Sequence, residues 1–320
     1  MRIDNMPLDK TLFENTQHGQ LDFPIQYYVD ELHKFFNRRV PLHWHFEPEF
    51  FVARGGSVLV HVGQHCVELK ANDGIFISSN TLHCYEQKNE NDVCECPNIV
   101  FSAELIAPYN SVLYKKYVMP ILADKNLPYV ILHAQESWHS EILIKLENIF
   151  ALLQRFGSES SYGSFPFLDF NMDSISEVGF EMQVQFLLSQ IWLSFVQHQK
   201  QLPTVPFGKR DLQYQARLQN MISFIKENYM NPLTLEDISN SANISKSEAS
   251  RCFNSYVKCS PVEYLLQYRI EVAQCLLHGT IRSIQEISLE CGFSSPSYFI
   301  RMFRKKVGVT PGEYRKKNSI

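Results

Sequence analysis

Histidine and carboxylate side chains gather near the start of the chain in a pattern that suits metal or polar-ligand chemistry. His43, His45 and Glu49 lie within seven residues of one another, and His83 and Tyr85 follow downstream. Imidazole nitrogens and carboxylate oxygens are donors that transition metals take from proteins. Positions 43, 45 and 49 share parity, so a single extended strand would turn all three side chains toward the same side. The sequence therefore predicts that these five residues line one site.

Three interpretations of this cluster remain open. It could hold a divalent metal, it could line a pocket for a small polar effector, or its histidines could be core residues without any ligand. An inward-facing histidine is often satisfied by its neighbours, so the residue types do not decide among the three. The sequence offers no separate nucleophile and base beside the cluster, which favours binding over catalysis.

The elements that must position the cluster are predicted to be short strands. Apolar and β-branched runs at residues 49–53, 57–62, 66–69, 74–78, 98–102 and 129–132 are separated by turns rich in glycine, asparagine and serine. Strands of this length and spacing predict an all-β barrel or sandwich.

Helical sequence follows the strands. Two apolar stripes repeat at spacings of four, three and four residues. Their members are Ile142, Leu146, Ile149 and Leu153, and then Val184, Leu188, Ile191 and Phe195. This spacing is typical of a seam between helices, which here is either a dimer interface or packing against the protein's own strands. We expect a loop over 157–170 between the two helices.

The last hundred residues contain one unit twice, which indicates a supersecondary motif used in tandem. An offset of 50 aligns Ser245 with Ser295, Arg251 with Arg301, Phe253 with Phe303 and Pro261 with Pro311. An offset of 49 aligns Ile238 with Ile287 and Asn243 with Gly292.

Each copy predicts two helices joined by a tight turn. Asn243 and Gly292 stand at the corner, and these two residue types accept positive φ most readily. Ser245 and Ser295 stand where a hydroxyl would cap the second helix. Two such units predict tandem helix-turn-helix motifs that bind DNA.

Charge is divided along the chain in agreement with this prediction. Residues 209–320 hold 16 Lys and Arg against 10 Asp and Glu, which leaves 14 basic and 24 acidic residues in the first 208. The net charge is therefore +6 in the last part and −10 in the first part. Because phosphate neutralisation supplies most non-specific DNA affinity, the basic part is where the duplex should bind.

The residues around the repeat form a dense set of motifs. They are the runs 261–277, 283–287 and 298–306, the Gly292-Phe293 pair, and the run Thr310 to Arg315. Together they resemble the signature of the AraC/XylS family of bacterial transcription regulators, over about a third of the chain. The resemblance implies a long helix at about 262–278 that holds two recognition helices in successive major grooves.

The same resemblance implies which residues contact DNA. The base-contacting positions are Ser247, Ser250 and Arg251 in the first unit, and Pro296, Ser297, Ile300 and Arg301 in the second. An arginine can bond guanine O6 and N7 together, so Arg251 and Arg301 are the sharpest candidates. Arg304 and Lys305 are expected to bind backbone phosphates, with a solvated surface as the alternative.

The histidine pattern carries a second resemblance. His43-x-His45-x3-Glu49-x6-Gly56, followed by a later glycine and His83, is similar to the two sequence motifs of the cupin barrel. Cupin enzymes bind iron, manganese or zinc with such residues. In regulators of this fold the same cavity usually holds a small effector, so the resemblance implies an effector pocket at His43, His45, Glu49, His83 and Tyr85, with a divalent metal as the alternative.

The sequence thus predicts a multidomain protein. We expect a cupin-like barrel over 1–135, a helical dimerisation region over 136–200, a linker over 201–210 and a DNA-binding domain over 211–320. The expected function is sequence-specific transcription regulation in response to a small effector, with a carbohydrate as the candidate. A cupin metalloenzyme that carries a DNA-binding tail is the alternative.

Partners and location follow from the same residues. The expected partners are double-stranded DNA, the effector, a second copy of the chain and, as a further candidate, RNA polymerase. The chain opens on polar sequence without a cleavable signal, and no apolar run approaches the ~20 residues of a membrane span. We therefore expect a cytoplasmic protein whose eight cysteines are reduced.

Overall fold

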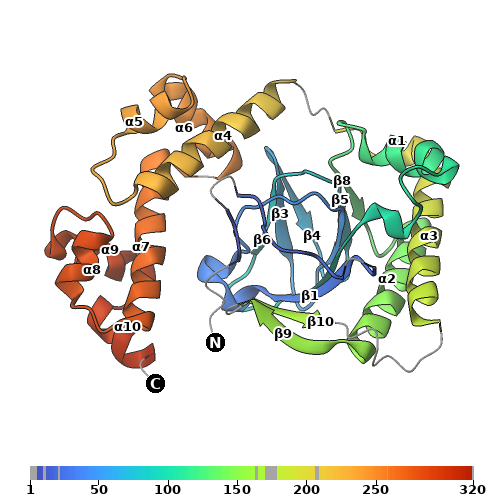
Figure 1. The fold of residues 1–320 in the computed structure, drawn as a ribbon, viewed down its shortest axis with the longest axis horizontal. Coiled ribbons are helices and arrows are strands. Elements are labelled where there is room, and N and C mark those ends of the chain that lie inside the picture. Colours follow the sequence, from blue (N-terminus) through green and yellow to red (C-terminus); the bar gives the residue numbers. More distant parts are fainter. Residues whose placement is uncertain are drawn as a thin grey trace. The chain divides into compact units, whose positions relative to one another are not determined.

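The computed structural model describes residues 6–9, 12–20, 22–162, 165–169, 179–205, 209–257 and 259–318. The chain divides into two units, an N-terminal unit that extends to Leu212 and a C-terminal unit from Gln213 onward (Figure 1). Part of the expected 201–210 linker, residues 206–208, lies outside the described residues. Each unit is described by itself below.

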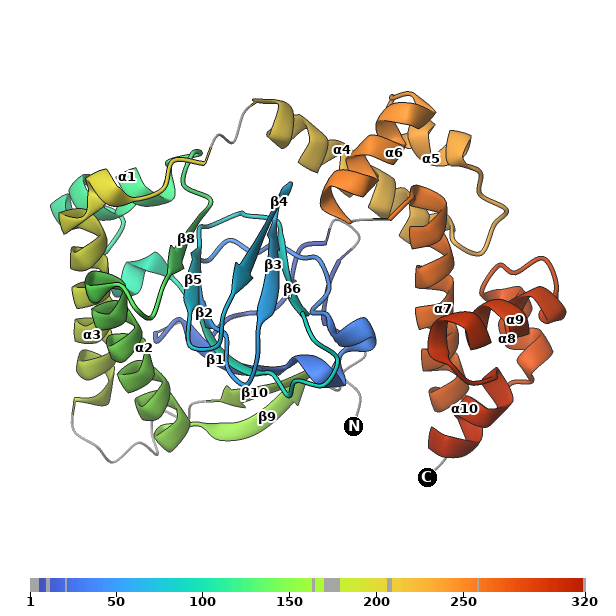
Figure 2. The same cartoon turned by 180° about the vertical axis from the view of Figure 1, so that it is seen from behind.

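The N-terminal unit is built on two antiparallel sheets. The larger has the strand order β8-β5-β2-β7-β1-β10-β9, and the smaller has the order β4-β3-β6 (Figure 2). The strands are β1 Ile25–Glu31, β2 Glu49–Val52, β3 Val58–Val62, β4 His65–Leu69, β5 Gly74–Ile77, β6 His83–Gln87, β7 Glu95–Phe101, β8 Tyr129–Leu132, β9 Ser158–Tyr162 and β10 Phe165–Asp169.

The strand prediction is confirmed for the six runs that the sequence singled out, and it misses four strands. β1, β6, β9 and β10 were not predicted, and the β9–β10 hairpin stands where a loop was expected over 157–170. Among the described strands, no pairing joins the small sheet to the large one, so the expected barrel appears as two sheets without a closed ladder.

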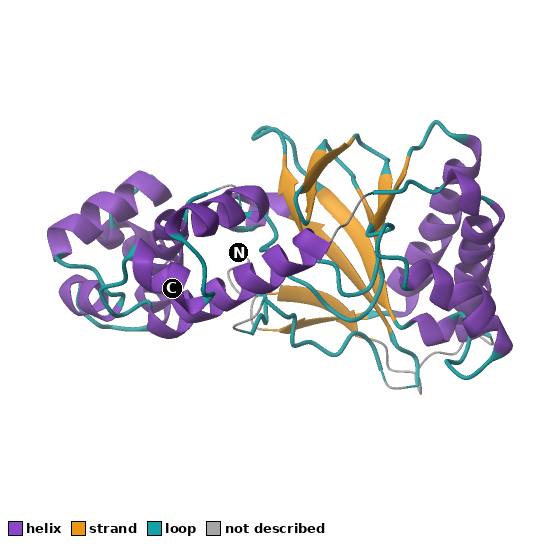
Figure 3. Ribbon diagram, turned by 90° about the horizontal axis from the view of Figure 1, so that it is seen from above, coloured by secondary structure: helices purple, strands orange, loops and turns teal. Residues whose placement is uncertain are grey.

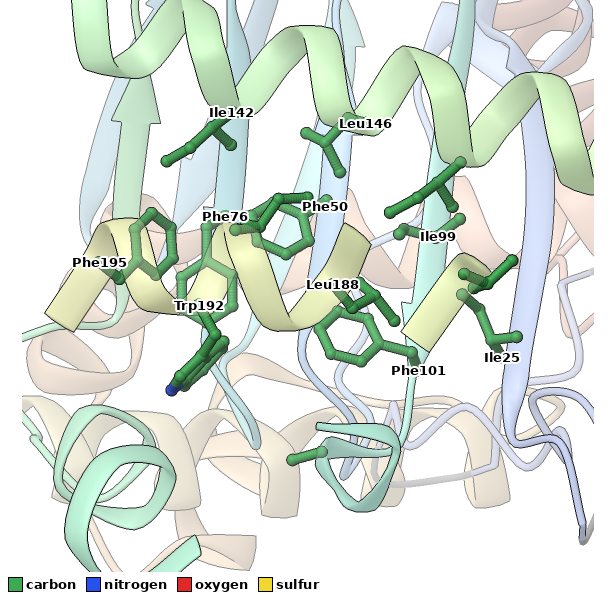
Figure 4. Packing of buried hydrophobic residues seen from close by; sticks show 14 of the residues in the cluster. Ile25, Phe50, Phe76, Ile99, Phe101, Ile142, Leu146, Leu188, Trp192 and Phe195 are labelled. Carbon is green, nitrogen blue, oxygen red and sulfur yellow. The ribbon is translucent and has the colours of Figure 1, made fainter. Parts of the chain in front are cut away.

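Helices α2 (Ser137–Phe156) and α3 (Phe180–Gln197) pack against each other and against one face of the large sheet (Figure 3). Both predicted apolar stripes face this interior, where Ile142 and Leu188 lie against Phe50, Phe76 and other strand residues (Figure 4). These stripe residues are at most 1% exposed. The dimer interface predicted at these side chains is therefore wrong: they form the core of their own unit. The segment just before the short helix α1 (Met119–Leu122) adjoins α3, because the Trp192 indole donates a hydrogen bond to the Tyr117 carbonyl.

The second face of the large sheet encloses a separate apolar core together with the small sheet. Side chains of this core include Tyr28, Phe51, Val60, Ile75 and Tyr85. Alternation along each strand produces this division: on β2, Phe50 and Val52 face the helices, while Glu49 and Phe51 face the space between the sheets. The polar cluster lies at one end of that space.

The C-terminal unit is helical. Its helices are α4 Lys209–Asn228, α5 Leu235–Ser241, α6 Lys246–Tyr256, α7 Pro261–Gly279, α8 Ile284–Glu290, α9 Pro296–Val307 and α10 Pro311–Asn318. The long helix expected at about 262–278 is thus confirmed as α7. Within the described part of the chain, no helix is long and apolar enough to span a membrane.

Recurring cap chemistry explains where these helices begin. Thr234, Ser260 and Ser283 each accept a hydrogen bond from the amide three residues on, and an acidic side chain at that position bonds back to the cap. Ser245 and Ser295 cap α6 and α9 as the sequence predicted. The tight turns before these helices use Asn243 at φ 53° and Gly292 at φ 75°.

The internal repeat is visible in the packing of equivalent side chains. Phe253 of α6 meets Tyr264 of α7 with ring centroids 5.6 Å apart, and Phe303 of α9 meets Tyr314 of α10 at 5.5 Å. Both pairs follow the sequence offset of 50. The two helix pairs α5–α6 and α8–α9 are therefore two copies of one packing unit.

Candidate functional sites

The polar cluster predicted from the sequence comes together inside the N-terminal unit. His43, His45, Glu49, His83 and Tyr85 are between 0 and 3% exposed. One ligand atom from each of His43, His45, Glu49 and His83 lies within 4.8 Å of all the others. The residues do not share one strand, as parity had suggested. Glu49 opens β2, His83 opens β6, and His43 reaches β6 through an isolated bridge to His83.

Backbone carbonyls fix the orientation of all three imidazoles. Nδ1 of His43 lies 2.8 Å from the Pro41 oxygen, and Nδ1 of His45 lies 2.8 Å from the Glu47 oxygen. Nδ1 of His83 lies 2.7 Å from the Thr81 oxygen. A carbonyl oxygen only accepts, so Nδ1 of each ring donates. Nε2 is left to face the cluster: in a protonated ring it donates to Glu49, and in a neutral ring it presents the lone pair that a metal-binding histidine needs.

Glu49 lies at the centre of the cluster. Its Oε2 is 3.3 Å from Nε2 of His45 and 3.0 Å from Nε2 of His83, while its Oε1 accepts a 2.8 Å hydrogen bond from the Tyr85 hydroxyl. Burial raises the pKa of the Glu49 carboxyl, but the hydrogen bonds from His45 and His83 outweigh burial and hold the pKa well below its ordinary value. Glu49 is thus an anion in a dry site.

The distances test whether this set fits a metal ion. Two neutral Nε2 lone pairs that face an ionised carboxylate repel it unless a proton or a cation lies between them. Ligands about 2.1 Å from a metal stand about 3.0 Å apart at right angles and about 3.4 Å apart in a tetrahedron. The observed separations of 3.0 and 3.3 Å fall in that range. Three imidazoles and one carboxylate therefore fit a divalent transition metal.

Burial and neighbouring imidazoles support the same conclusion for His43. Burial, and then the adjacent His83 and His45, hold the pKa of His43 well below its ordinary value. The ring of His43 lies 4.2 Å from that of His83, measured between centroids. A neutral imidazole is the form that binds metal, so this ring is ready to coordinate without first losing a proton.

Two residues that the sequence analysis missed extend the cluster. Glu14 is 2% exposed and His18 is 5% exposed. Oε2 of Glu14 lies 4.0 Å from Nε2 of His43 and 3.7 Å from Nε2 of His18. Nδ1 of His18 bonds the Tyr28 hydroxyl at 2.9 Å, whereas its buried Nε2 has no hydrogen-bond partner. The spacing of four residues between Glu14 and His18 was the only sequence signal that could have linked them, and nothing in the neighbouring sequence marked them as buried.

Burial dominates the electrostatics of this pair. Burial, and then the charge of Glu49, raise the pKa of Glu14 to about 8. Burial, and then His45, lower the pKa of His18 to about 3. Both side chains are therefore neutral near pH 7. His18, His45 and Glu47 form a second group whose ligand atoms lie within 4.8 Å of one another, and it shares His45 with the first.

The predicted DNA-contacting residues lie on two equivalent helices of the C-terminal unit. On α6, the buried face consists of Ala249, Cys252, Phe253 and Tyr256. Ser247 and Arg251 are exposed on the other side, and Ser250 is half-buried. Ser247 also lies within 3.1 Å of the Ser245 hydroxyl, which caps the helix. The amino-terminal half of α6 is thus open to a partner.

Helix α9 repeats this arrangement. Phe299 and Phe303 are buried, while Ser297, Ile300 and Arg301 are exposed and Pro296 is half-buried. The Arg301 guanidinium lies over the Tyr298 ring at 5.4 Å, which holds it beside the helix start. Arg304 and Lys305 are exposed in the last turn of α9. Both sets of predicted side chains are therefore available for contact with DNA.

Comparison with known proteins agrees with this arrangement. Residues 238–317 match a family model described as a helix-turn-helix domain. The chain is 30% identical over 322 residues to YdeC, an uncharacterized HTH-type transcriptional regulator of Bacillus subtilis, covering 99% of this chain and all of that protein.

Two further relatives match over a shorter length. The lactose operon transcription activator of Staphylococcus xylosus is 36% identical over 103 residues, which are 32% of this chain and 37% of that protein. A solved regulator from Chromobacterium violaceum with an AraC-type DNA-binding domain is 33% identical over 33% of this chain and 94% of its own, with a TM-score of 0.32. The full-length likeness to YdeC and the motifs of the repeat show that the chain belongs to the AraC/XylS family of helix-turn-helix transcription regulators.

Proposed function

We propose that this regulator contacts DNA through α6 and α9 and responds to a ligand bound at the buried histidine–glutamate cluster. In this proposal the N-terminal unit is a cupin-like sensor and the C-terminal unit holds tandem helix-turn-helix motifs. The single observation that carries the sensor role is the convergence of His43, His45 and His83 on Glu49. No other group of three or more metal-ligating side chains that avoids these four residues occurs in the part of the chain that the structure describes.

The proposed DNA contacts divide by chemistry. Arg251 and Arg301 are assigned to guanine edges, because guanidinium can donate to O6 and N7 at once. Ser247, Ser250 and Ser297 suit shorter polar contacts, and Ile300 suits a thymine methyl group. Pro296 sets the start of α9, while Arg304 and Lys305 bind phosphates.

A divalent metal is the occupant that the cluster geometry supports best. His43, His45, Glu49 and His83 would hold it, and Tyr85 would orient the carboxylate. A bound metal would supply positive charge against Glu49. Its ligands come from two segments, residues 43–49, which lead into β2 of the large sheet, and His83 of β6 in the small sheet, so their alignment depends on the arrangement of both sheets. Occupancy of the site is therefore a means by which the N-terminal unit could change its stability or shape.

A carbohydrate effector is the second candidate. Its support is the name of the Staphylococcus xylosus relative, a lactose operon activator, whose match covers about a third of this chain. The cluster side chains are at most 3% exposed, so a sugar would need the surrounding segments to open before it entered. A thermal-shift screen against sugars and metals separates the two candidates, because a specific ligand stabilises by RT ln(1 + [L]/Kd).

A metalloenzyme that carries a DNA-binding tail is the alternative function. It shares the same metal site but requires a substrate to reach it. Turnover of a small substrate that disappears on chelation would favour the enzyme. A metal-dependent change in DNA affinity without turnover would favour the regulator, and the named relatives are all regulators.

We include dimerisation in the proposal, but through a different face of the 136–200 helices. Met182, Phe186 and Leu193 are 73, 62 and 53% exposed and follow one stripe of α3 at spacings of four and seven. Ile144 on α2 is 59% exposed. An apolar stripe on the outside of a helix that is already packed on its inner face suits a second copy of the same helix. RNA polymerase remains a proposed partner of the DNA-bound dimer.

One experiment tests the regulator directly. The full-length protein, before and after chelation, is incubated with a randomised duplex pool, and the recovered sequence is used to compare affinities. We expect about one metal per chain by elemental analysis and a 5- to 150-fold difference in DNA affinity on metal removal, which is the usual range of allosteric coupling. A His45→Ala, His83→Ala double variant should bind DNA and dimerise but lose this difference. A double variant that responds like the wild type would place the sensor elsewhere.

A further inference from the structure

The two DNA-contacting helix pairs are joined by more than α7. The loop between α4 and α5, at Tyr229 to Asn231, lies against the turn between α8 and α9, at Gly292. A Cβ atom added to Gly292 would lie 2.4 Å from the Tyr229 oxygen and 2.9 Å from the Met230 Cα. Real Cβ atoms essentially never approach other heavy atoms to less than 3.0 Å. The loop that leads into the first helix pair (α5–α6) and the turn within the second helix pair (α8–α9) are therefore in direct backbone contact.

Arg269 of α7 connects this contact to the central helix. Its Nε donates to the Tyr229 oxygen at 2.8 Å, and its NH2 group donates to the Asn231 oxygen at 2.8 Å. The guanidinium carbon lies 6.0 Å from the centroid of Phe293, the residue after Gly292. One side chain on α7 thus touches both the loop that leads into the first helix pair and the turn within the second helix pair. We call Arg269, the loop 229–231 and the turn 292–293 the inter-unit junction.

Neighbouring side chains reinforce the junction. Tyr229 meets Tyr268 of α7 edge to face, with centroids 5.3 Å apart. Gly292 has φ +75°, so its conformation and the nearby carbonyl both exclude a side chain. The Tyr229 oxygen both accepts from Arg269 and lies close to Gly292, so loss of the Arg269 donor leaves a backbone acceptor without this bond.

The geometry points to a role for Arg269 beyond local stability: we propose that it is the positioning residue that fixes the spacing between the two DNA half-sites. A single connection through α7 would let the two helix pairs rotate about its ends. The junction adds a second connection between the same two bodies, which removes that rotation. Recognition helices in successive major grooves must keep a separation of about one turn, 34 Å, so their relative angle sets which half-site spacing they accept.

Arginine is the residue type that this role requires. Its planar fork presents two donors in fixed geometry to two carbonyls that are two residues apart. A lysine ammonium keeps the charge but satisfies these two carbonyls less rigidly. Arg269→Lys therefore loosens the junction without changing the protein's charge toward DNA. This inference rests on the proposed function, because it assumes that both α6 and α9 bind DNA.

The test is selection of binding sites from a randomised 40-base-pair duplex pool by the full-length protein. We expect the wild type to recover two half-sites at one spacing, and Arg269→Lys to recover the same half-sites over several spacings. On the recovered site, one inserted base pair between the half-sites should weaken wild-type binding at least tenfold but weaken Arg269→Lys less than threefold. The insertion penalty is the ratio of two affinities that are measured with one protein preparation. A fraction of inactive protein changes both affinities by the same factor and leaves the ratio unchanged.

Two further variants keep the test decisive. Gly292→Ala opens the junction from the opposite side and should also lower the insertion penalty. Arg282→Lys is the matched control: its exposed guanidinium pairs with Glu290 of α8, outside the junction, and its penalty should equal that of the wild type. An unchanged penalty in both junction variants overturns the inference. If the wild type recovers only one half-site, the inference is also overturned, but for another reason: its premise that both α6 and α9 bind DNA would then have failed.

Discussion

The Tyr85 hydroxyl donates a 2.8 Å hydrogen bond to Oε1 of Glu49, and this contact decides which carboxylate oxygen faces the imidazoles. Oε2 is left toward His45 and His83, at 3.3 and 3.0 Å. The Tyr85 ring in turn stacks on Phe51 of β2 with centroids 3.9 Å apart. Phe51 of β2 thus fixes the position of the Tyr85 ring, and Tyr85 in turn fixes the Glu49 carboxylate.

Removing this hydroxyl should weaken metal binding without removing a ligand. In Tyr85→Phe, Oε1 of Glu49 loses its donor, and the carboxylate is free to rotate. We expect metal affinity to fall about 10- to 100-fold, the usual effect of losing an outer partner of a ligand. Competition with a chromophoric chelator measures this. Tyr27→Phe makes the same change on β1, where Tyr27 belongs to the core beneath the helices and not to the cluster, and this variant should bind metal like the wild type. Equal affinities in Tyr85→Phe and wild type would contradict the role.

The stability of the metal-free N-terminal unit should fall as pH rises from about 6.5 to 8. Burial, and then Glu49, raise the pKa of Glu14 from 4.5 to about 8. Between these values the folded protein holds a proton that the unfolded chain has lost, so the free energy of unfolding decreases with pH. His18 acts oppositely, because its pKa is lowered from 6.5 to about 3 and the unfolded chain holds the extra proton. The effect of His18 opposes that of Glu14 only below pH 6.5, so it does not offset the decline between pH 6.5 and 8.

Glu14→Gln should therefore reduce the decline by the share of one proton, which is at most about 1.4 kcal/mol per pH unit, while Asp30, whose pKa burial also raises, keeps its own share. All three tryptophans, at positions 44, 138 and 192, belong to the N-terminal unit, so their fluorescence during urea unfolding in chelator follows this unit alone. Glu68→Gln is the control, since that exposed carboxylate pairs with Lys88 at 2.6 Å. An unchanged decline in Glu14→Gln would assign it to another group.

Local patterns were enough to predict the C-terminal unit. Cap residues, corner residues and the apolar stripes of α6 and α9 are set by neighbours in sequence, so Ser245, Gly292 and Phe303 could be placed without the fold. The junction could not be predicted, because Arg269 meets Tyr229 across 40 residues. No periodic pattern encodes such a contact.

The cluster was predicted for a reason that only partly holds. Parity on one strand was expected to align His43, His45 and Glu49, but β2 begins at Glu49 and the histidines precede it. The side chains converge because β6 brings His83 beside His43. Glu14 and His18 were missed because their burial depends on tertiary packing. The seam on α3 was misjudged because a helical stripe shows that a face is buried, not which surface covers it.

Two substitutions two residues apart on α3 should separate dimerisation from folding. Phe186 is 62% exposed, so Phe186→Glu should leave the unit folded and dissociate the dimer. Leu188 is 1% exposed within the core, so Leu188→Glu buries a charge and should unfold the unit. Sedimentation at tens of micromolar, with tryptophan fluorescence for folding, distinguishes the two results. Gln183→Glu adds the same charge at an exposed polar position and should remain a dimer. A wild type that sediments as a monomer would contradict the proposed interface.

Arg251 and Arg301 should determine sequence preference. Replacing either with alanine removes a side chain proposed to donate to two guanine atoms. We expect each change to cost about 1–3 kcal/mol on the selected site and to relax the preference at one base position. Quantitative binding to the selected duplex and to single-base variants of it provides the measurement. Either variant losing the same factor on selected and random duplex would reassign that arginine to a phosphate.

Lys305 should behave differently from Arg251 and Arg301, because it is exposed in the last turn of α9, beyond the proposed base contacts. A lysine that neutralises one phosphate releases about one counterion, whatever the sequence beneath it. Lys305→Ala should therefore weaken selected and random duplexes by the same factor and reduce the slope of log affinity against log salt by about one. Titrations at several salt concentrations on both duplexes measure the factor and the slope together. A sequence-dependent loss with an unchanged slope would place Lys305 at a base edge and would shift the proposed contact surface toward the end of α9.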